Sequence, residues 1–386
     1  MALLGLLQAL DPERVDIDLF VYSHEGELMK FIPDYVHLLP EDKTWSMYEK
    51  PLKYVLKQGH IGMVTARLAA KLMMCYYVHK NHPKDRTASF GYTGKMVSKI
   101  LPDLYQYGTY DLAISFLMPH NFVLDHVHAK RKICWIHTDY SYVDVNVELE
   151  LPIWSAYGHV VSISRNVTES FLVKFPSLEL KIVEIENILS PGFVLLRASQ
   201  EVDVKTEMPL LTQCVSLLSI GRFCEQKNFD NVPDICSCII QSGCNVKWYI
   251  IGFGGDESLI RQRIAESGMQ EHVILLGKKT NPYPYIKACD IYVQPSRYEG
   301  KSVTVREAQM LCKPVVVTNY ATAGSQIQNG VDGVIVPMDN EGCAKGIAEF
   351  IHDTEKQKRV IEYLKEHDYG NEGEVEKIYQ IINTVN

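Results

Sequence analysis

Short apolar runs the length of β-strands alternate along the chain with longer helical segments. In the first half they include 111–116 (DLAISF) and 132–136 (KICWI), and in the second half 214–220 and 246–251. Strands that alternate with helices form parallel sheets covered by helices on both faces, and strands buried in this way read as apolar runs. The sequence therefore predicts an α/β fold built on doubly wound parallel sheets.

The length of the chain predicts two domains, because 386 residues exceed what one hydrophobic core usually supports. Residues 190–209 are polar and lack a strand pattern, which makes them the best candidate for a linker. We expect an N-terminal domain over residues 1–200 and a C-terminal domain over residues 210–365. We expect residues 366–386 to form a helix that packs back on the N-terminal domain.

The start of the chain lacks a strand that this kind of fold requires. A helix is expected over residues 2–10, followed by a strand over residues 15–22. In a doubly wound sheet the first helix follows a central strand. We therefore expect the N-terminal domain to lack its first strand, which would leave the neighbouring strands unpaired.

Charge and cysteine content exclude several classes of protein. The net charge of −8 argues against nucleic acid as a partner. The ten cysteines show no C-x-x-C pair and no zinc-ligand spacing. No run of about 18 apolar residues is present, and the first residues lack the basic region and the cleavage site of a signal peptide. We therefore expect a cytoplasmic protein with reduced thiols and no bound metal.

A basic region over residues 50–86 contains Lys50, Lys53, Lys57, Arg67 and Lys71 among apolar residues. One interpretation is a solvated helix face. The other is a surface that contacts anionic lipid, which would associate the protein with the inner face of a membrane. The sequence leaves both open.

The segment 290–307 (DIYVQPSRYEGKSVTVRE) combines a strand, a loop and the start of a helix. The loop holds Glu299 and Gly300, and the helix carries Glu307. The N-terminus of a helix binds phosphate, and a carboxylate beside it binds hydroxyls, so the segment suits a nucleotide sugar. The alternative is structural, because Thr304 and Glu307 fit a capping box in which Glu307 only caps its helix.

Two cations follow the first strand of the expected C-terminal domain. Arg222 and Lys227 would lie at the carboxyl edge of the same sheet as Glu299, where they could neutralise a diphosphate. The glycines over 252–255 lack the G-x-G-x-x-G spacing of a dinucleotide site. We interpret them as a tight turn that a nucleotide base can approach.

His137 and Asp139 follow the predicted strand 132–136 in the expected N-terminal domain. A lone histidine usually has a structural role. The neighbouring carboxylate and the position at a sheet's carboxyl edge favour a site role for His137.

These motifs resemble those of the retaining glycosyltransferases of family 4, a family that includes bacterial capsular and lipopolysaccharide glycosyltransferases. The carrying segments are 219–228 (SIGRFCEQKN), 249–257 (YIIGFGGDE), 281–308, 313–319 (KPVVVTN) and 329–337 (NGVDGVIVP), and Glu299 and Glu307 match the family's E-x₇-E pair. The resemblance is strong over 215–350 and weaker over 15–190. It implies the GT-B fold, in which two Rossmann-like domains face each other.

The resemblance also implies roles for individual residues. Arg222 and Lys227 would hold the donor diphosphate, Glu299 the hydroxyls of the transferred sugar, and Glu307 the ribose. The backbone of Gly300, Lys301, Ser302 and Val303 would add phosphate contacts, and Gly252, Lys278 and Thr280 would line the base. His137, with Asp139, would face the sugar and the acceptor. Such enzymes need no metal and no cofactor besides the nucleotide sugar.

The function that follows is transfer of a hexosyl group, with retention, from a nucleotide sugar, UDP-linked by expectation, to a glycan or lipid-linked acceptor in cell-surface polysaccharide biosynthesis. One alternative is a nucleotide-sugar-binding protein with impaired or no catalysis, which the absent first strand would explain. Another is a GT-B epimerase of nucleotide sugars, which the E-x₇-E spacing disfavours. Gln326 also departs from the family, because many members carry Glu at this position, and the change could alter the donor pocket.

Overall fold

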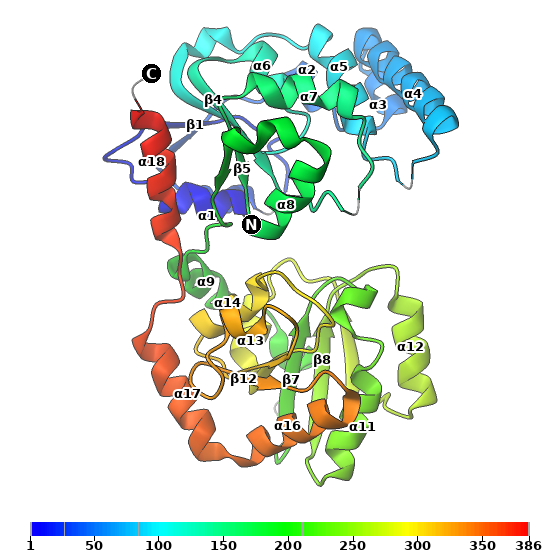
Figure 1. Cartoon of the computed structure of the whole chain (residues 1–386), viewed down its shortest axis with the longest axis vertical. Coiled ribbons are helices and arrows are strands. Elements are labelled where there is room, and N and C mark those ends of the chain that lie inside the picture. Colours follow the sequence, from blue (N-terminus) through cyan, green and yellow to red (C-terminus); the bar gives the residue numbers. More distant parts are fainter. Residues whose placement is uncertain (1, 27, 84, 142, 210–211, 385–386) are drawn as a thin grey trace. The chain divides into compact units, whose positions relative to one another are not determined.

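The computed structural model describes residues 2–26, 28–83, 85–141, 143–209 and 212–384, and the chain forms two compact units (Figure 1). The N-terminal unit comprises Met1–Ile188 and Asn371–Asn386, and the C-terminal unit comprises Leu189–Gly370. Both contain parallel sheets covered by helices, so the α/β prediction is confirmed.

The sheet of the N-terminal unit is in two pieces. One piece has the strand order β3-β4-β5-β6, and the other is the pair β1-β2. The strands are β1 (Ile17–Leu19), β2 (Val36–Leu38), β3 (Thr109–Ser115), β4 (His128–Ile136), β5 (His159–Ser162) and β6 (Ile182–Glu184). Among the described residues no strand joins β1 to β3, and a side-chain hydrogen bond from Tyr110 Oη to Asp18 Oδ2, 2.6 Å long, connects them instead.

Successive side chains of β4 point to opposite faces of the sheet, so the strand contributes to two cores, one on each face. Ile133 and Trp135 pack with the helix at the start of the chain and with the last helix. Cys134 and Ile136 pack on the other face with α7 and α8. The helices are α1 (Ala2–Ala9), α2 (Lys43–Ser46), α3 (Leu52–Lys57), α4 (Ile61–Asn81), α5 (Ser89–Val97), α6 (Asn121–His126), α7 (Val147–Ala156), α8 (Arg165–Lys174) and α18 (Glu376–Asn383). The C-terminal helix α18 thus belongs to the N-terminal unit.

Helix α4 corrects one expectation. It has 21 residues and is long and apolar enough to cross a membrane by the criteria of length and composition, although no such segment was expected. Its buried residues are Met63, Ala66, Ala70 and Met74. One face of α4 is therefore part of the core of the unit.

The C-terminal unit contains one parallel sheet with the strand order β12-β11-β10-β7-β8-β9. Its strands are β7 (Val215–Ile220), β8 (Val246–Ile251), β9 (Val273–Gly277), β10 (Ile291–Gln294), β11 (Val315–Thr318) and β12 (Val334–Val336). From β7 the chain winds outward through β8 and β9, and it then returns to the other side of β7 to form β10. The order reverses between β7 and β10, and ligands of open parallel sheets bind where the loops diverge at such a point.

Helices cover both faces of this sheet. They are α9 (Pro191–Ala198), α10 (Val204–Glu207), α11 (Val232–Gln241), α12 (Glu257–Glu266), α13 (Tyr283–Ala288), α14 (Val303–Met310), α15 (Ala323–Gln326), α16 (Asn340–His352) and α17 (Thr354–Glu366). Helices α11, α12 and α16 form the main core on one face with Leu217, Trp248 and Val316.

The predicted linker is wrong. Residues 190–209 contain α9 and α10, and α9 packs against α13 and α14 in the C-terminal unit. Ser190 caps α9 by accepting a hydrogen bond from the Phe193 N–H, and Phe193 and Val194 are buried. The segment from 189 to 200, which we placed in the N-terminal domain, therefore belongs to the C-terminal unit.

Candidate functional site

Two loops meet where the strand order reverses, one after β7 and one after β10. The first contains Lys227, at the end of a 3₁₀ turn over Glu225–Lys227, and the second contains Glu299. Lys227 Nζ lies 2.5 Å from Glu299 Oε1. The two side chains are only 15% and 7% exposed, so the ion pair is nearly withdrawn from water. The prediction that these residues share one sheet edge is confirmed.

The backbone around Lys227 positions its side chain next to Glu299. A Cβ atom at Gly221 would come within 3.0 Å of the Lys227 side chain, so the glycine leaves room for the lysine to pass. Asn228 adopts a left-handed conformation with φ of 59°, which ends the 3₁₀ turn. Its side-chain amide donates to the carbonyl of Pro295 in the other loop, at 2.9 Å.

Arg297 fixes the same two loops together from the side. Its backbone N–H donates to the carbonyl of Gln226 at 2.9 Å. Its guanidinium forms two hydrogen bonds to the carboxylate of Asp230, at 2.9 and 2.7 Å. Paired hydrogen bonds of this kind fix orientation as well as distance. The Lys227–Glu299 contact is therefore held by the loops that carry it.

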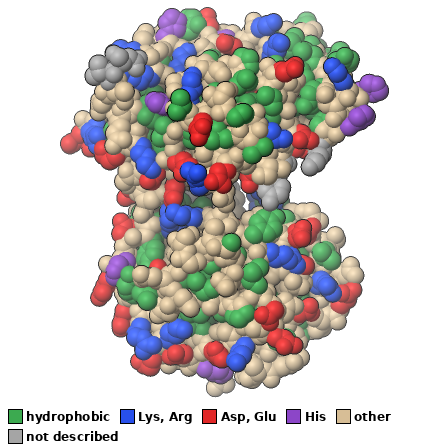
Figure 2. All heavy atoms as spheres, in the orientation of Figure 1, with side chains coloured by type: hydrophobic (Ala, Val, Ile, Leu, Met, Phe, Trp, Pro, Cys, Tyr) green, Lys and Arg blue, Asp and Glu red, His purple; other side chains and the backbone are tan. Residues whose placement is uncertain are grey.

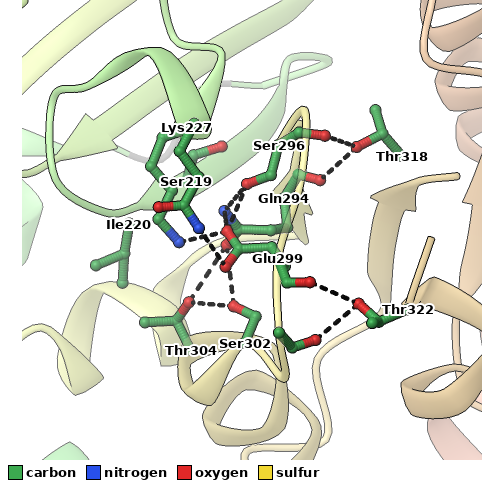
Figure 3. A network of polar contacts seen from close by, with 12 residues as sticks. Ser219, Ile220, Lys227, Gln294, Ser296, Glu299, Ser302, Thr304, Thr318 and Thr322 are labelled. Carbon is green, nitrogen blue, oxygen red and sulfur yellow. Dashed lines mark hydrogen bonds and ion pairs between the residues drawn. The ribbon is translucent and has the colours of Figure 1, made fainter. Parts of the chain in front are cut away.

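Glu299 is also held by neutral hydrogen-bond donors (Figure 3). Ser296 Oγ donates to Glu299 Oε1 at 2.6 Å, and the side-chain amides of Gln294 and Gln226 lie 3.4 and 3.3 Å from its two oxygens. Gln294 is fully buried, and its carbonyl oxygen accepts from the Tyr292 hydroxyl at 2.9 Å. Sequence analysis missed Gln294 and Ser296. The signal was present, because a buried strand that ends in polar residues at a loop boundary is unusual.

The start of α14 lies beside this pair, and its first turn is partly occupied. The Ser302 N–H donates to Gln326 Oε1 at 3.0 Å, and Gln326 Nε2 donates to the carbonyl of Ser302 at 2.7 Å. These two contacts fix the orientation of the Gln326 amide. One backbone N–H that we expected to face phosphate is therefore engaged by a side chain. Of the neighbouring candidates, Lys301 is exposed and Val303 is 39% exposed.

Glu307 is buried on the inner side of α14, with 6% of its surface exposed. Its Oε1 accepts a hydrogen bond from the Tyr283 hydroxyl at 2.7 Å. Burial raises the pKa of the Glu307 carboxyl to about 7, and the Tyr283 hydrogen bond opposes that shift. The capping-box interpretation is wrong, because α14 begins at Val303, so that Thr304 lies inside the helix, and its N-cap Ser302 makes no side-chain capping bond.

The other predicted donor residues lie on neighbouring loops of the same sheet edge. Arg222 is exposed, and its side chain makes no hydrogen bond or ion pair within the described part of the chain. Lys278 Nζ lies 5.2 Å from the centre of the Phe253 ring. Thr280 is exposed, and its carbonyl accepts from the guanidinium of the buried Arg197 at 2.9 Å.

Gly252 and Gly254 are explained by contacts between loops. A Cβ atom would lie 1.9 Å from the carbonyl oxygen of Gly221 at position 252, and 2.3 Å from that of Phe223 at position 254. The Phe223 N–H donates to the carbonyl of Phe253 at 2.9 Å. The glycines therefore let the loop after β8 pack on the loop after β7. This packing accounts for them with or without a bound base.

His137 and Asp139 lie in the loop after β4 of the N-terminal unit but do not form a pair. His137 Nε2 donates to the carbonyl of Phe116 at 3.0 Å, and burial lowers the pKa of its imidazole. Asp139 Oδ1 accepts from both the N–H and the hydroxyl of Ser141, at 2.8 and 2.6 Å. Among the described residues no contact joins the two side chains.

Residues 213–367 match the family model of the glycosyl transferases group 1. The matched range covers most of the C-terminal unit, including the site built on Lys227 and Glu299. The similarity to that family therefore lies in the C-terminal unit.

Curated relatives match over a similar length. The lipopolysaccharide core biosynthesis mannosyltransferase LpsB of Rhizobium meliloti is 29% identical over 143 residues, which are 34% of this chain and 40% of the relative. AmsK, an amylovoran biosynthesis glycosyltransferase of Erwinia amylovora, is 28% identical over 149 residues, or 36% of each chain. The matches thus span about two fifths of these relatives. A third relative, from Campylobacter jejuni, is the N-acetylgalactosamine-N,N'-diacetylbacillosaminyl-diphospho-undecaprenol 4-alpha-N-acetylgalactosaminyltransferase, 28% identical over 37% of this chain and 39% of its own.

Solved structures show the fold. A glycosyltransferase from Rickettsia africae superposes with a TM-score of 0.58 at 16% identity and covers 99% of this chain and 95% of its own. HepE of Anabaena, solved with UDP and glucose, has a TM-score of 0.56 at 15% identity over 77% of this chain and 81% of its own. The chain has the GT-B fold of these glycosyltransferases, with two Rossmann-like domains.

Proposed function

We propose that the chain is a retaining hexosyltransferase that uses a nucleotide sugar, with a UDP-sugar as the expected donor, and transfers the sugar to a glycan or lipid-linked acceptor in cell-surface polysaccharide biosynthesis. The observation that carries the proposal is the buried Lys227–Glu299 pair at the point where the strand order reverses. Burying two opposite charges costs free energy, so such a pair is weak evidence for a stabilising role. It is well suited to a ligand that carries both phosphate and hydroxyl groups.

The chemistry of the pair separates into two tasks. A diphosphate that approaches Lys227 would share or replace Glu299 as the partner of the ammonium group. The Glu299 oxygens would then accept hydrogen bonds from the sugar hydroxyls, while Ser296 and Gln294 keep the carboxylate in place. As the bond to the sugar breaks, negative charge develops on the leaving diphosphate. Fixed cations stabilise that charge without having to reorganise.

Further residues would contact the remaining parts of the donor. Arg222, exposed on the loop after β7, is the second cation for the diphosphate. Glu307, held by Tyr283, would accept a ribose hydroxyl. The relatives support the substrate classes, since HepE was solved with UDP and glucose and the Campylobacter jejuni relative is named for a diphospho-undecaprenol acceptor. The proposal gives no step to a metal ion, and it leaves His137 and Asp139 as candidates on the acceptor side.

The test separates binding from turnover. Thermal shift with UDP, GDP and a panel of their sugars should raise the melting temperature of the native chain for one nucleotide, because a ligand that binds only the folded state stabilises it. Lys227→Ala should lose UDP affinity by about tenfold or more, since a charge-assisted contact to phosphate is removed. Glu299→Gln should retain UDP affinity and lose most turnover of bound donor. Arg261→Ala, which breaks an exposed pair with Glu257 on α12, is the control and should change neither.

Two outcomes would refute the proposal. If no nucleotide sugar binds or is hydrolysed, the site does not hold a donor. If Lys227→Ala and Glu299→Gln weaken UDP binding equally and leave turnover of bound donor unchanged, the division of tasks is wrong.

A second function, nucleotide-sugar binding without transfer, is favoured by one observation. The Ser302 N–H at the start of α14 is engaged by Gln326 and is not free for a phosphate. Donor binding with no transfer or hydrolysis across a panel of glycan and lipid-linked acceptors would support this function. Any transfer that depends on Glu299 would exclude it.

A further inference from the structure

The outward face of α4 is apolar, which is the reverse of what a helix on the surface of a protein usually presents. Ile61, Leu68, Leu72 and Tyr76 lie opposite its buried face, with exposed fractions of 63%, 45%, 71% and 69%. Their spacing of seven and four residues keeps them on one side of the helix. Single exposed apolar residues are ordinary, but a row of four large ones along one helix is not.

Helix α3 packs against α4 and carries exposed apolar residues of its own. Val55 of α3 is buried, whereas Tyr54 and Leu56 are 45% and 55% exposed. We call the combined surface the α3–α4 face. It consists of Tyr54, Leu56, Ile61, Leu68, Leu72 and Tyr76. Figure 2 shows hydrophobic, basic and histidine side chains at the end of the N-terminal unit where Figure 1 places α4.

The same segment is strongly basic in a chain whose net charge is −8. Residues 50–84 contain seven Lys and Arg residues and no Asp or Glu. Two of these cations are engaged, since Lys50 pairs with Glu25 at 2.7 Å and Arg67 donates to the carbonyl of Lys50 at 2.6 Å. Lys53, Lys57, Lys71 and Lys80 are exposed, and they form no ion pair with any described residue.

We infer that the α3–α4 face docks on the surface of a membrane that contains anionic lipid. Its aliphatic side chains would enter the boundary between headgroups and acyl chains, and the lysines around them would meet the lipid phosphates. Tyr54 and Tyr76 suit this depth, because tyrosine has an apolar ring and a polar end. The combination distinguishes a membrane from nucleic acid, which would meet the lysines but gain nothing from exposed Leu and Ile.

The position of α4 in the core argues for docking and against spanning. Met63 and Ala66 pack in one core cluster with Trp45 and Val97, and Ala70 and Met74 pack in another with Tyr92. A spanning helix would have to leave these clusters and expose them. A helix that keeps one face in the protein core can offer only its other face to lipid, so it lies along the membrane surface.

The experiment is sedimentation of the full chain with vesicles, in the absence of any sugar donor. Vesicles that contain phosphatidylglycerol should bind the protein, vesicles of phosphatidylcholine alone should bind it weakly, and added salt should release part of it. Leu68→Asp with Leu72→Asp should lower the partition by about 100-fold, because two side chains that enter lipid are lost. Lys53→Gln with Lys57→Gln should lower it by about 25-fold, since each lysine near an anionic surface contributes about fivefold.

The chain offers matched controls on the same unit. Val173 and Leu180 are 79% and 99% exposed but lie outside the α3–α4 face. Val173→Asp with Leu180→Asp should therefore leave vesicle binding unchanged. All substituted side chains are exposed, so a circular dichroism melt should show that each variant remains folded.

Several outcomes would overturn the inference. One is absence of binding to phosphatidylglycerol vesicles, and another is equal loss in the control variant. Binding that is equal on neutral vesicles and resists an alkaline wash would show a spanning helix instead. Dimerisation without vesicles that is abolished by Leu68→Asp would show that a second copy covers the face. None of these outcomes depends on whether the C-terminal unit binds a nucleotide sugar.

Discussion

The pKa of Glu307 leads to a stability prediction that can be worked out in advance. Burial raises the pKa of this carboxyl from 4.5 to about 7 in the folded chain. Between these values the folded state binds more protons than the unfolded state, so the free energy of unfolding must fall as the pH rises. A tenfold difference in proton affinity corresponds to about 1.4 kcal/mol, and the loss of stability between pH 5 and pH 8 is about 2.5 kcal/mol. Above pH 8 the contribution is constant.

Glu307→Gln removes the titration and retains an oxygen that can accept from Tyr283. The variant should match the wild type near pH 5 and be more stable by about 2.5 kcal/mol at pH 8. Since the chain has two units, the measurement should be hydrogen exchange in urea, resolved to peptides of β7 and β10. If the free energy of unfolding depends on pH equally in wild type and variant, the argument that burial raises the pKa of Glu307 is refuted.

Glu150 supplies a matched control in the N-terminal unit. It is 1% exposed, and burial likewise raises the pKa of its carboxyl to about 7. Glu150→Gln should therefore remove the same pH dependence from peptides of β4 and leave β7 and β10 unchanged. If Glu150→Gln also reduces the pH dependence of the free energy of unfolding in the C-terminal unit, the pH dependence observed there does not come from Glu307.

Three further changes test the site. Lys227→Met should destabilise the C-terminal unit by about 3 kcal/mol in urea unfolding, because it leaves Glu299 buried without its cation. Lys227→Met with Glu299→Gln should cost less than the sum of the single changes, and additive costs would contradict the pairing. Gly254→Ala should cost about 2 kcal/mol because its Cβ meets the Phe223 carbonyl, whereas Gly255→Ala, with nothing within 4 Å, should be neutral in the same assay. Gln326→Ala should raise UDP affinity in a calorimetric titration by freeing the Ser302 N–H, and a fall would show that Gln326 itself binds the ligand.

The fold was largely predictable, because buried parallel strands leave a simple pattern. The run 214–220 corresponds to β7 (Val215–Ile220), and 132–136 forms the end of β4 (His128–Ile136). The failure at residues 190–209 has a physical reason. Composition identified the segment as polar, but Ser190 followed by Pro191 is a capping signal, and Phe193 and Val194 supply the apolar face that buries α9. The capping residue and the apolar face of α9 therefore determined the structure of this segment, although its average composition is polar.

The site was predictable only to the level of a sheet edge. Topology brings Lys227 and Glu299 to one edge, but their distance depends on backbone details such as the space at Gly221 and the left-handed Asn228. Gln294 was missed because pattern analysis reads it as the end of a strand. Its role appears only when its hydrogen bonds are known.

The contacts around the Lys227–Glu299 pair indicate that the two charges serve to bind a ligand and not to stabilise the fold. A buried ion pair can often be replaced by apolar side chains with no loss of stability. Here the loop after β7 is instead fixed by Arg297, which pairs with Asp230 and bonds to Gln226, and by Asn228, which bonds to the carbonyl of Pro295. These contacts hold the ammonium and the carboxylate together at the edge of the sheet, where the strand order reverses. A ligand with an anionic part and a hydroxyl-rich part can use both charges at once, and a nucleotide sugar has both.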